Sequence, residues 1–191
     1  MNFDLLDRNL STVLAEGRLV ATEAHRTFGH LSARQVNWKP SETEWSIGQC
    51  FDHLVISNRA YVPIFEAIVH GRKRTRIWER MPLLPRFFGR LIIKILHPES
   101  SRNAKARKRF LPSSSAIDPG IIGTFLEEHG RLMTLMEGTR DLDLDRITIT
   151  SPVLAVITYS LMDAHRIVVV HEQNHFVQAR RVLESAGFPA G

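Results

Sequence analysis

The sequence predicts a single all-α domain over residues 1–191, with four long helices in a bundle and a basic insert, itself partly helical, at about residues 71–115. Apolar residues recur every three or four positions over four long stretches, which is the period of a helix with one buried face. Capping residues, prolines and glycines stand where these stretches begin and end. A length of 191 residues with 43% hydrophobic residues suits one globular domain with its own core.

The first predicted helix spans Phe3–Phe28, where apolar or small residues recur at helical spacing with charged residues between them. The segment that follows, 31–44, contains Pro40, which disfavours helix at the residue before it. We therefore expect an ordered loop there.

The second predicted helix begins at Ser46 and runs to about His70. Ser46 is followed three residues later by Gln49, which is the spacing of a capping box, and Gly71 follows the last turn. Apolar residues lie nearly all round this helix, so we expect it to be buried.

The third helix is expected to begin at Asp118, an N-cap followed by Pro119 in the first turn, and to run to about Met136. Residues 141–150 alternate as a strand does, but the sequence shows no second strand to pair with them, so we expect an extended connector. The fourth helix is expected over Ser160–Ser185, because Ser160 followed three residues later by Asp163 has the spacing of another capping box. A run of β-branched residues lies near its middle, but the helical period continues beyond that run.

The insert is strongly basic, because residues 71–110 carry 13 of the 25 Lys and Arg residues and two of the 20 acids. Residues 83–96 are predicted to form a short amphipathic helix. Its apolar stripe consists of Leu84, Phe87, Phe88, Leu91, Ile92, Ile95 and Leu96, and Arg86, Arg90 and Lys94 lie on the other side. A soluble monomer rarely exposes such a stripe, so we expect the helix to fold back over the bundle as a lid.

Two other partners would also cover this stripe: a second subunit in a homodimer, or a membrane surface bound weakly through residues 83–96. Nucleic-acid binding is not expected, because the chain outside the insert is mildly acidic. The N-terminus lacks a basic region followed by an apolar run, and no stretch approaches the roughly 18 apolar residues of a membrane span. We expect a cytoplasmic protein, and the single Cys50 is consistent with a reducing compartment.

Two histidines in the fourth helix, His171 and His175, stand four residues apart and therefore share one face, as a pair of metal ligands does. A third ligand must come from elsewhere in the chain. The candidate is His53, in the apolar second helix. His165 is a poor candidate, because it lies about 120° round the helix from the pair.

The same segment also reads H-E-x-x-H, the pattern of zinc proteases in which Glu172 would activate water. We expect no protease, because no third ligand follows His175 in the sequence. Cys50 lies about 60° from His53 and could approach the metal, although a buried structural cysteine is the simpler interpretation. For His129, on the apolar face of the third helix, we expect a packed and hydrogen-bonded core histidine.

Three short stretches carry a family resemblance: N-W-K-P at 37–40, W-S-I-G-Q-C-F-D-H-L at 45–54, and H-E-Q-N-H-F-V-Q at 171–178. With the helix pattern, they resemble the DinB-like superfamily, also called YfiT-like metal-dependent proteins. The resemblance implies an up-down-down-up four-helix bundle in which His53, His171 and His175 bind one divalent metal, often zinc or nickel. It also implies thiol chemistry, since the family's known activities are those of bacillithiol S-transferases and mycothiol-dependent isomerases.

The function expected first is that of a metal-dependent transferase, which moves a low-molecular-weight thiol onto an electrophilic small molecule. Zinc is the first candidate metal, with nickel, manganese and iron as alternatives. Gln178, nearly one turn beyond His175 on the same face, is expected to lie beside the metal and orient a bound water or substrate. A metal-dependent hydrolase is the alternative enzyme. A binding protein that uses the basic insert for membrane or nucleic acid, with the metal as a structural staple, is the alternative of a different class.

Overall fold

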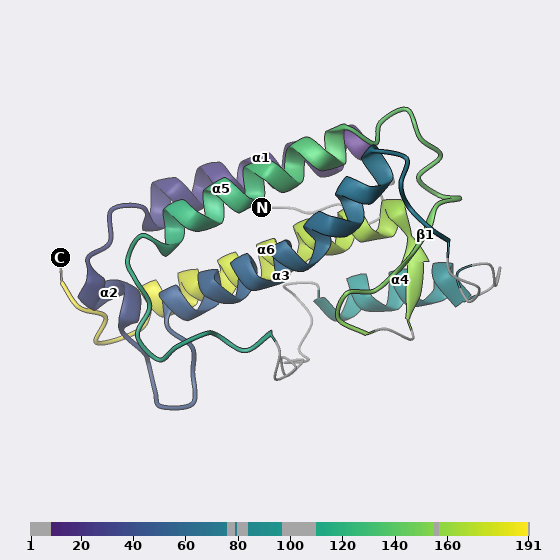
Figure 1. Cartoon of the computed structure of the whole chain (residues 1–191). Helices are drawn as coiled ribbons and strands as arrows, with labels where there is room; N and C mark the ends of the chain where they lie inside the picture. Colours follow the sequence, from purple (N-terminus) through teal and green to yellow (C-terminus); the bar gives the residue numbers. More distant parts are fainter. Residues whose placement is uncertain (1–8, 76–78, 80–83, 97–109, 155–156, 191) are drawn as a thin grey trace.

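Four long helices form the body of the molecule: α1 (Leu10–Phe28), α3 (Ile47–Val69), α5 (Ile121–Glu137) and α6 (Leu161–Leu183). The computed structural model describes residues 9–75, 79, 84–96, 110–154 and 157–190. Figure 1 shows that α1 and α6 run in one direction along the bundle and that α3 and α5 run in the other. This is the predicted up-down-down-up arrangement.

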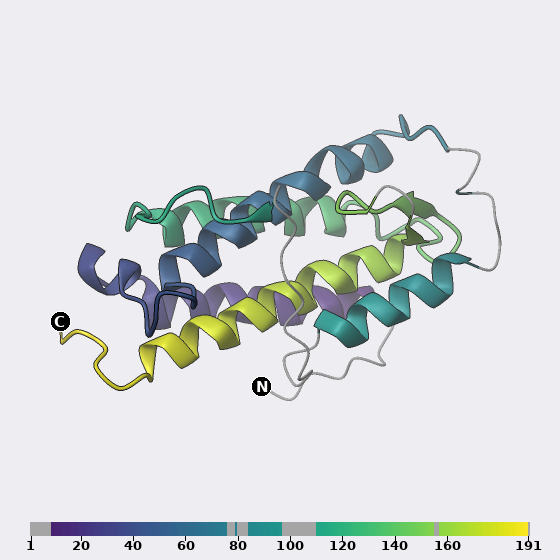
Figure 2. The same ribbon diagram turned by 90° about the horizontal axis from the view of Figure 1, so that it is seen from below.

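Each long helix has two long neighbours, because α3 and α1 both pack against α5 and α6 (Figures 1 and 2). Each also contributes one phenylalanine to a ring cluster in the core: Phe28, Phe51, Phe125 and Phe176. Phe51 lies edge-on to Phe28 and Phe125, at centroid distances of 5.3 and 5.1 Å. This cluster joins all four helices at one level of the bundle. Burial of each such side chain stabilises the fold by about 1.5–3 kcal/mol.

The second helix begins as predicted. The Ser46 hydroxyl accepts the Gln49 backbone N–H at 3.1 Å, and the Gln49 side chain accepts the Ser46 N–H at 3.2 Å. Ser160 likewise caps α6 through the Asp163 N–H at 3.1 Å. These two caps fix the starts of the helices that carry the three candidate ligands.

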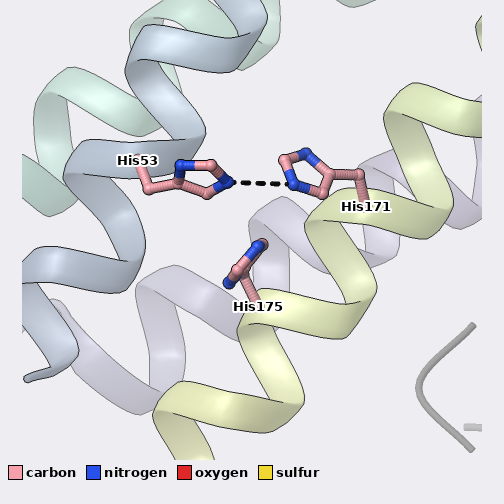
Figure 3. A group of neighbouring side chains, drawn as sticks. All are labelled: His53, His171 and His175. Carbon is pink, nitrogen blue, oxygen red and sulfur yellow. Dashed lines mark hydrogen bonds between the residues drawn. The ribbon is translucent and has the colours of Figure 1, made fainter. Parts of the chain in front are cut away.

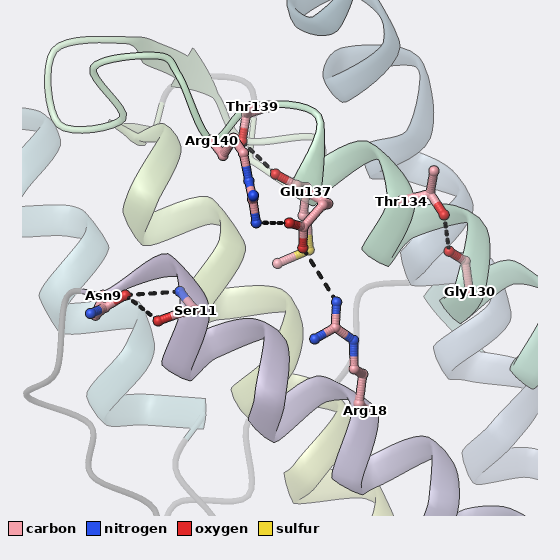
Figure 4. A network of polar contacts seen from close by, with 9 residues as sticks. Asn9, Ser11, Arg18, Gly130, Thr134, Glu137, Thr139 and Arg140 are labelled. Atoms are coloured by element: carbon pink, nitrogen blue, oxygen red, sulfur yellow. Dashed lines mark hydrogen bonds and ion pairs between the residues drawn. The ribbon is translucent and has the colours of Figure 1, made fainter.

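Two helix starts differ from the prediction. The first helix begins at Leu10 rather than Phe3, because Asn9 is extended and its side chain accepts the Ser11 N–H at 2.9 Å (Figure 4). Residues 1–8 lie outside the described part of the chain. The third long helix begins at Ile121, since Asp118 binds the Gly120 N–H at 2.7 Å in a separate turn before it. Figure 4 also shows Arg18 of α1 bonded to Glu137 at the end of α5.

The segment 31–44, predicted as loop, contains the short helix α2 (Ala33–Asn37). A second capping box starts it, in which the Ser32 hydroxyl accepts the Gln35 N–H and the Gln35 side chain accepts the Ser32 N–H. The connector before the fourth helix was also predicted wrongly. Its strand β1 (Thr148–Thr150) pairs antiparallel with β2 (Thr158–Ser160). The central pair of this hairpin, Ile149 and Tyr159, is buried in the core, and this packing holds strands of three residues in place.

The helix predicted within the insert is α4 (Leu84–Leu96), and it folds back against α6 and β2 (Figure 2). Its inner face differs from the predicted stripe, because Ile93 is buried at 4% exposure whereas Leu91 is 40% exposed. Gly89 lies on the inner face of α4 and allows its close approach to α6, because a methyl group at this position would lie 2.5 Å from the Asp163 carboxylate. The side chains of Leu84, Arg86, Phe87 and Phe88 lie outside the described part of the chain.

One core histidine is expected to destabilise the fold. His165 is fully buried against the Phe65 ring, and within the described part of the chain neither ring nitrogen has a hydrogen-bond partner. We expect His165→Leu to raise the free energy of unfolding by about 1–3 kcal/mol, because it removes two unsatisfied polar atoms. Urea denaturation measures the change, with the exposed His30→Leu as a control that leaves stability unchanged.

The same variant should remove part of the protein's acid sensitivity. Burial lowers the pKa of His165 to about 3, so the folded state resists a proton that the unfolded state takes up below about pH 6.5. Titration of His165 therefore leaves the free energy of unfolding unchanged above pH 6.5 and lowers it progressively as the pH falls toward 3. A His165→Leu variant that is less stable, or that keeps the wild-type slope between pH 7 and 4, would contradict the prediction.

Candidate metal centre

The bundle brings the three predicted ligands together. His53 comes from α3, and His171 and His175 come from successive turns of α6 (Figure 3). One ligand atom from each residue lies within 4.8 Å of the other two, and the ring centroids are 4.6–5.0 Å apart. His53 is buried, and the other two are partly buried. Sequence positions 53 and 171 therefore meet at one point between two packed helices.

Two of the rings are held in a defined tautomer. His53 Nδ1 lies 2.5 Å from the carbonyl oxygen of Phe110, and because a carbonyl only accepts, this nitrogen carries the proton. His175 Nδ1 donates in the same way to Gln178 Oε1 at 2.8 Å. Both residues therefore present an Nε2 lone pair, as metal-bound histidines with an outer hydrogen bond do.

The geometry of the donors fits a divalent ion. Two nitrogens bound to one zinc ion at about 2.0–2.1 Å with tetrahedral angles stand roughly 3.3 Å apart. The Nε2 atoms of His53 and His171 are 3.1 Å apart (Figure 3). The three residues could thus hold one ion with only small movements of the rings.

The electrostatics of the centre favour neutral imidazoles. Burial lowers the pKa of all three histidines, and the neighbouring rings lower those of His171 and His175 further, that of His175 to about 3. For His53, the bond to Phe110 and the charge of Asp52 partly oppose the effect of burial. Neutral imidazole is the form that binds a metal, so near neutral pH little free energy is needed to deprotonate the ligands.

Trp45 forms one wall of the centre, a role that was not predicted from the sequence. Its ring is stacked on His175 at a centroid distance of 5.7 Å and tilted against His53 at 5.1 Å. The position of Trp45 directly before the Ser46 cap places it over the first turns of α3. It limits rotation of two of the three ligand rings.

Gln178 contacts a ligand directly, since its side-chain oxygen accepts the His175 Nδ1–H. A further role toward a bound water or substrate stays a prediction. Outer hydrogen bonds of this kind typically contribute 10–100-fold to metal affinity. We expect Gln178→Ala to weaken zinc binding by about tenfold, whereas Gln178→Glu, which keeps an acceptor, should bind as tightly as wild type. Competition with a chromophoric chelator measures both, and equal affinities for all three proteins would contradict this role.

Glu172 is bonded to other residues and does not belong to the histidine cluster, so it is not placed to activate water as the protease interpretation requires. Both carboxylate oxygens lie 3.0 Å from His129 Nδ1, and one also accepts from Asn58 Nδ2 at 2.7 Å. Glu172 is completely buried at the junction of α3, α5 and α6. The sequence signal of this network, which was not recognised, is the presence of Asn58, His129 and Glu172 among the apolar residues of three helices.

The expectation for His129 is met at Nδ1, which pairs with Glu172, while Nε2 has no hydrogen-bond partner among the described residues. Burial lowers the pKa of His129, but the charge and hydrogen bond of Glu172 together more than offset this, so the pKa lies above its ordinary value. His165 lies outside the cluster of three, as expected.

Cys50 is fully buried in the apolar core beside Phe51 and Leu54. Burial raises the pKa of its thiol well above the usual range. The only group of potential ligands found among the described residues consists of the three histidines. Cys50 is therefore a structural residue.

The chain belongs to the DinB superfamily, whose family model matches residues 18–179. This range includes all of α3 and α5, α1 from Arg18 onward, α6 as far as Ala179, and all three histidines. Searches of curated proteins and of solved structures find no significant match. Among the described residues, no helix is long and apolar enough to cross a membrane.

Proposed function

We propose that this DinB-superfamily protein is a metal-dependent enzyme that transfers a low-molecular-weight thiol to an electrophilic small molecule. One observation carries the proposal: three neutral imidazoles, with no carboxylate among them, converge within 4.8 Å. Such a donor set leaves the charge of a divalent ion uncompensated and therefore favours an anionic substrate atom. Zinc is the first candidate ion, and nickel, manganese and iron are the others.

His53, His171 and His175 would hold the ion, which when bound supplies an open coordination position and lowers the pKa of the thiol or water there. Phe110 and Gln178 hold two ligand rings in the required tautomer, and Trp45 restricts their rotation. In the transfer, the thiol loses its proton to solvent and its sulfur forms a bond to the electrophilic carbon. The bond from that carbon to the leaving group breaks, and the leaving group departs with the electron pair and takes up a proton from solvent.

The described part of the insert argues against membrane binding as the main function. A membrane-binding amphipathic helix must offer its apolar face to the lipid. In α4, Ile93 is buried in the protein core, and Ile92 and Leu96 pack against it. The side chains of Ile92, Ile93 and Leu96 are therefore already packed against the protein.

The proposal is tested with protein reconstituted with one divalent ion. We expect conjugation of a thiol, from a panel including glutathione, cysteine and bacillithiol, to an electrophile such as chlorodinitrobenzene. Chelation and His175→Ala should each abolish the reaction while far-UV circular dichroism stays unchanged. Hydrolysis of ester or amide substrates without any thiol-dependent reaction would identify the hydrolase instead, and collapse of the helices on chelation would make the metal structural.

A further inference from the structure

Residues 110–117, called here the strap, cross the face of α3 that carries His53. Four positions of the strap are tied to α2 and α3. The Phe110 carbonyl accepts from His53, the Ser113 N–H donates to Asp52 Oδ2 at 2.6 Å, and the Ser114 carbonyl accepts from Gln49 Nε2 at 3.2 Å. Ile117 closes the strap, since its N–H and its carbonyl both bond to the Asn37 side chain, at 2.7 and 2.8 Å.

These contacts follow one row of α3. Asp52 and His53 follow Gln49 by three and four residues, so all three lie on one side of the helix. Their partners in the strap, Ser114, Ser113 and Phe110, occur in the reverse order along the chain. Asp52 and His53 are sequence neighbours, and their partners in the strap are three residues apart. The strap therefore forms a loop whose two sides are fastened to adjacent residues of the helix.

Burial alone does not hold the middle of the strap. Phe110 and Ile117 are buried at its two ends, with exposures of 4% and 6%, but Leu111 is 44% exposed and Ser113 to Ala116 are exposed. Residues 111–116 belong to no helix or strand that would fix the Phe110 carbonyl. The Asp52 carboxylate, which is itself buried, holds the strap at Ser113, three residues along the chain from that carbonyl.

We propose that Asp52 is a positioning residue for metal binding: by holding the Ser113 N–H, it places the Phe110 carbonyl that orients His53. The inference rests on the proposed function, because it assumes that His53 is a metal ligand. It assigns a defined task to the last residues of the insert and the two that follow them, which is to set the tautomer and angle of one ligand ring.

Two substitutions of Asp52 separate its hydrogen bond from its charge. Asp52→Ala removes the acceptor and should weaken Zn²⁺ binding by about 10–100-fold, the usual effect of losing an outer-sphere partner. Asp52→Asn keeps an oxygen that can accept the Ser113 N–H, so its affinity should remain within about threefold of wild type. Ser113→Pro, which removes the donor without changing α3, should match Asp52→Ala.

Affinity is measured by competition with a chromophoric chelator, and the visible spectrum of the Co²⁺-loaded protein reports the geometry of the centre. At saturating Co²⁺, Asp52→Ala and Ser113→Pro should have altered ligand-field bands, and Asp52→Asn should have the wild-type spectrum. Tyr61→Phe is the matched control. This variant removes one buried hydrogen bond of the same helix, the 2.7 Å bond from Tyr61 to Tyr159. Because Tyr61 lies about 12 Å along the helix from His53, metal affinity and the Co²⁺ spectrum should stay unchanged.

Wild-type metal affinity in Asp52→Ala would overturn the inference. Equal losses of affinity in Asp52→Ala and Asp52→Asn would also overturn it, because the negative charge of Asp52 and not its hydrogen bond would then be the cause. His171→Ala distinguishes a failure of the positioning role from a failure of the metal centre itself. If it loses metal while Asp52→Ala does not, only the positioning role is wrong. If it binds metal as wild type does, the metal centre itself is wrong.

Discussion

Replacement of His171 by alanine is expected to abolish stoichiometric binding of a divalent metal. His171 faces both other ligands, because its Nε2 lies 3.1 Å from that of His53 and its ring centroid lies 4.7 Å from that of His175. Two imidazoles remain in the variant, and no cysteine or carboxylate joins the cluster among the described residues. The loss in affinity should exceed the ~10–100-fold that outer-sphere changes produce.

Metal analysis after dialysis, beside wild type, gives the result directly. His165→Ala is the matched control, because it removes a buried histidine from the same helix and leaves the three ligands in place. Wild type should retain about one ion per chain, His165→Ala should retain the same amount, and His171→Ala should retain none. Equal metal content in all three proteins would show that the histidine cluster is not the binding site.

The second large effect concerns the buried pair of Glu172 and His129. We expect His129→Leu to lower the free energy of unfolding by about 3–5 kcal/mol, because it leaves a buried carboxylate with one partner removed. Glu172 has no exposed surface, and Asn58 alone would remain bonded to it. Urea denaturation of the metal-free protein measures the loss.

A double variant shows whether the cost arises from the unpaired charge. Replacing both residues with leucine should recover much of the stability, since a buried ion pair can often be exchanged for apolar residues at little cost. A loss below 1 kcal/mol in His129→Leu, or a double variant whose losses simply add, would contradict this account.

The same pair predicts a dependence on pH. The folded-state pKa of His129 is raised, so its stabilising contribution is complete below the unfolded pKa of about 6.5 and is lost as the pH rises through the folded value. His129→Leu should remove this decline on the alkaline side. An unchanged slope of stability against pH in the variant would mean that another group titrates.

Much of the fold could be predicted because helix signals are local. The apolar period located all four long helices, and the caps at Ser46 and Ser160 were identified from residues three positions apart. The same signal was present and overlooked at Ser32 and Gln35, where it starts α2. The hairpin was missed for a different reason, because its short strands depend on the burial of Ile149 and Tyr159 against the rest of the protein.

The sequence by itself determined the helices and the pairing of His171 with His175, because the spacing of four residues brings two side chains together on any helix. It also nominated His53, which the family match places within the same domain. Only the tertiary structure decided the surroundings of these ligands. It placed Phe110 beside His53 and Trp45 against the rings of His53 and His175. It also turned Glu172 toward His129 and Asn58, which are 43 and 114 residues away in the sequence. It likewise decided which face of α4 is buried, through the contact of Gly89 with Asp163. Such contacts depend on how whole helices are rotated and packed against one another, and the local period of a sequence carries no information on that rotation.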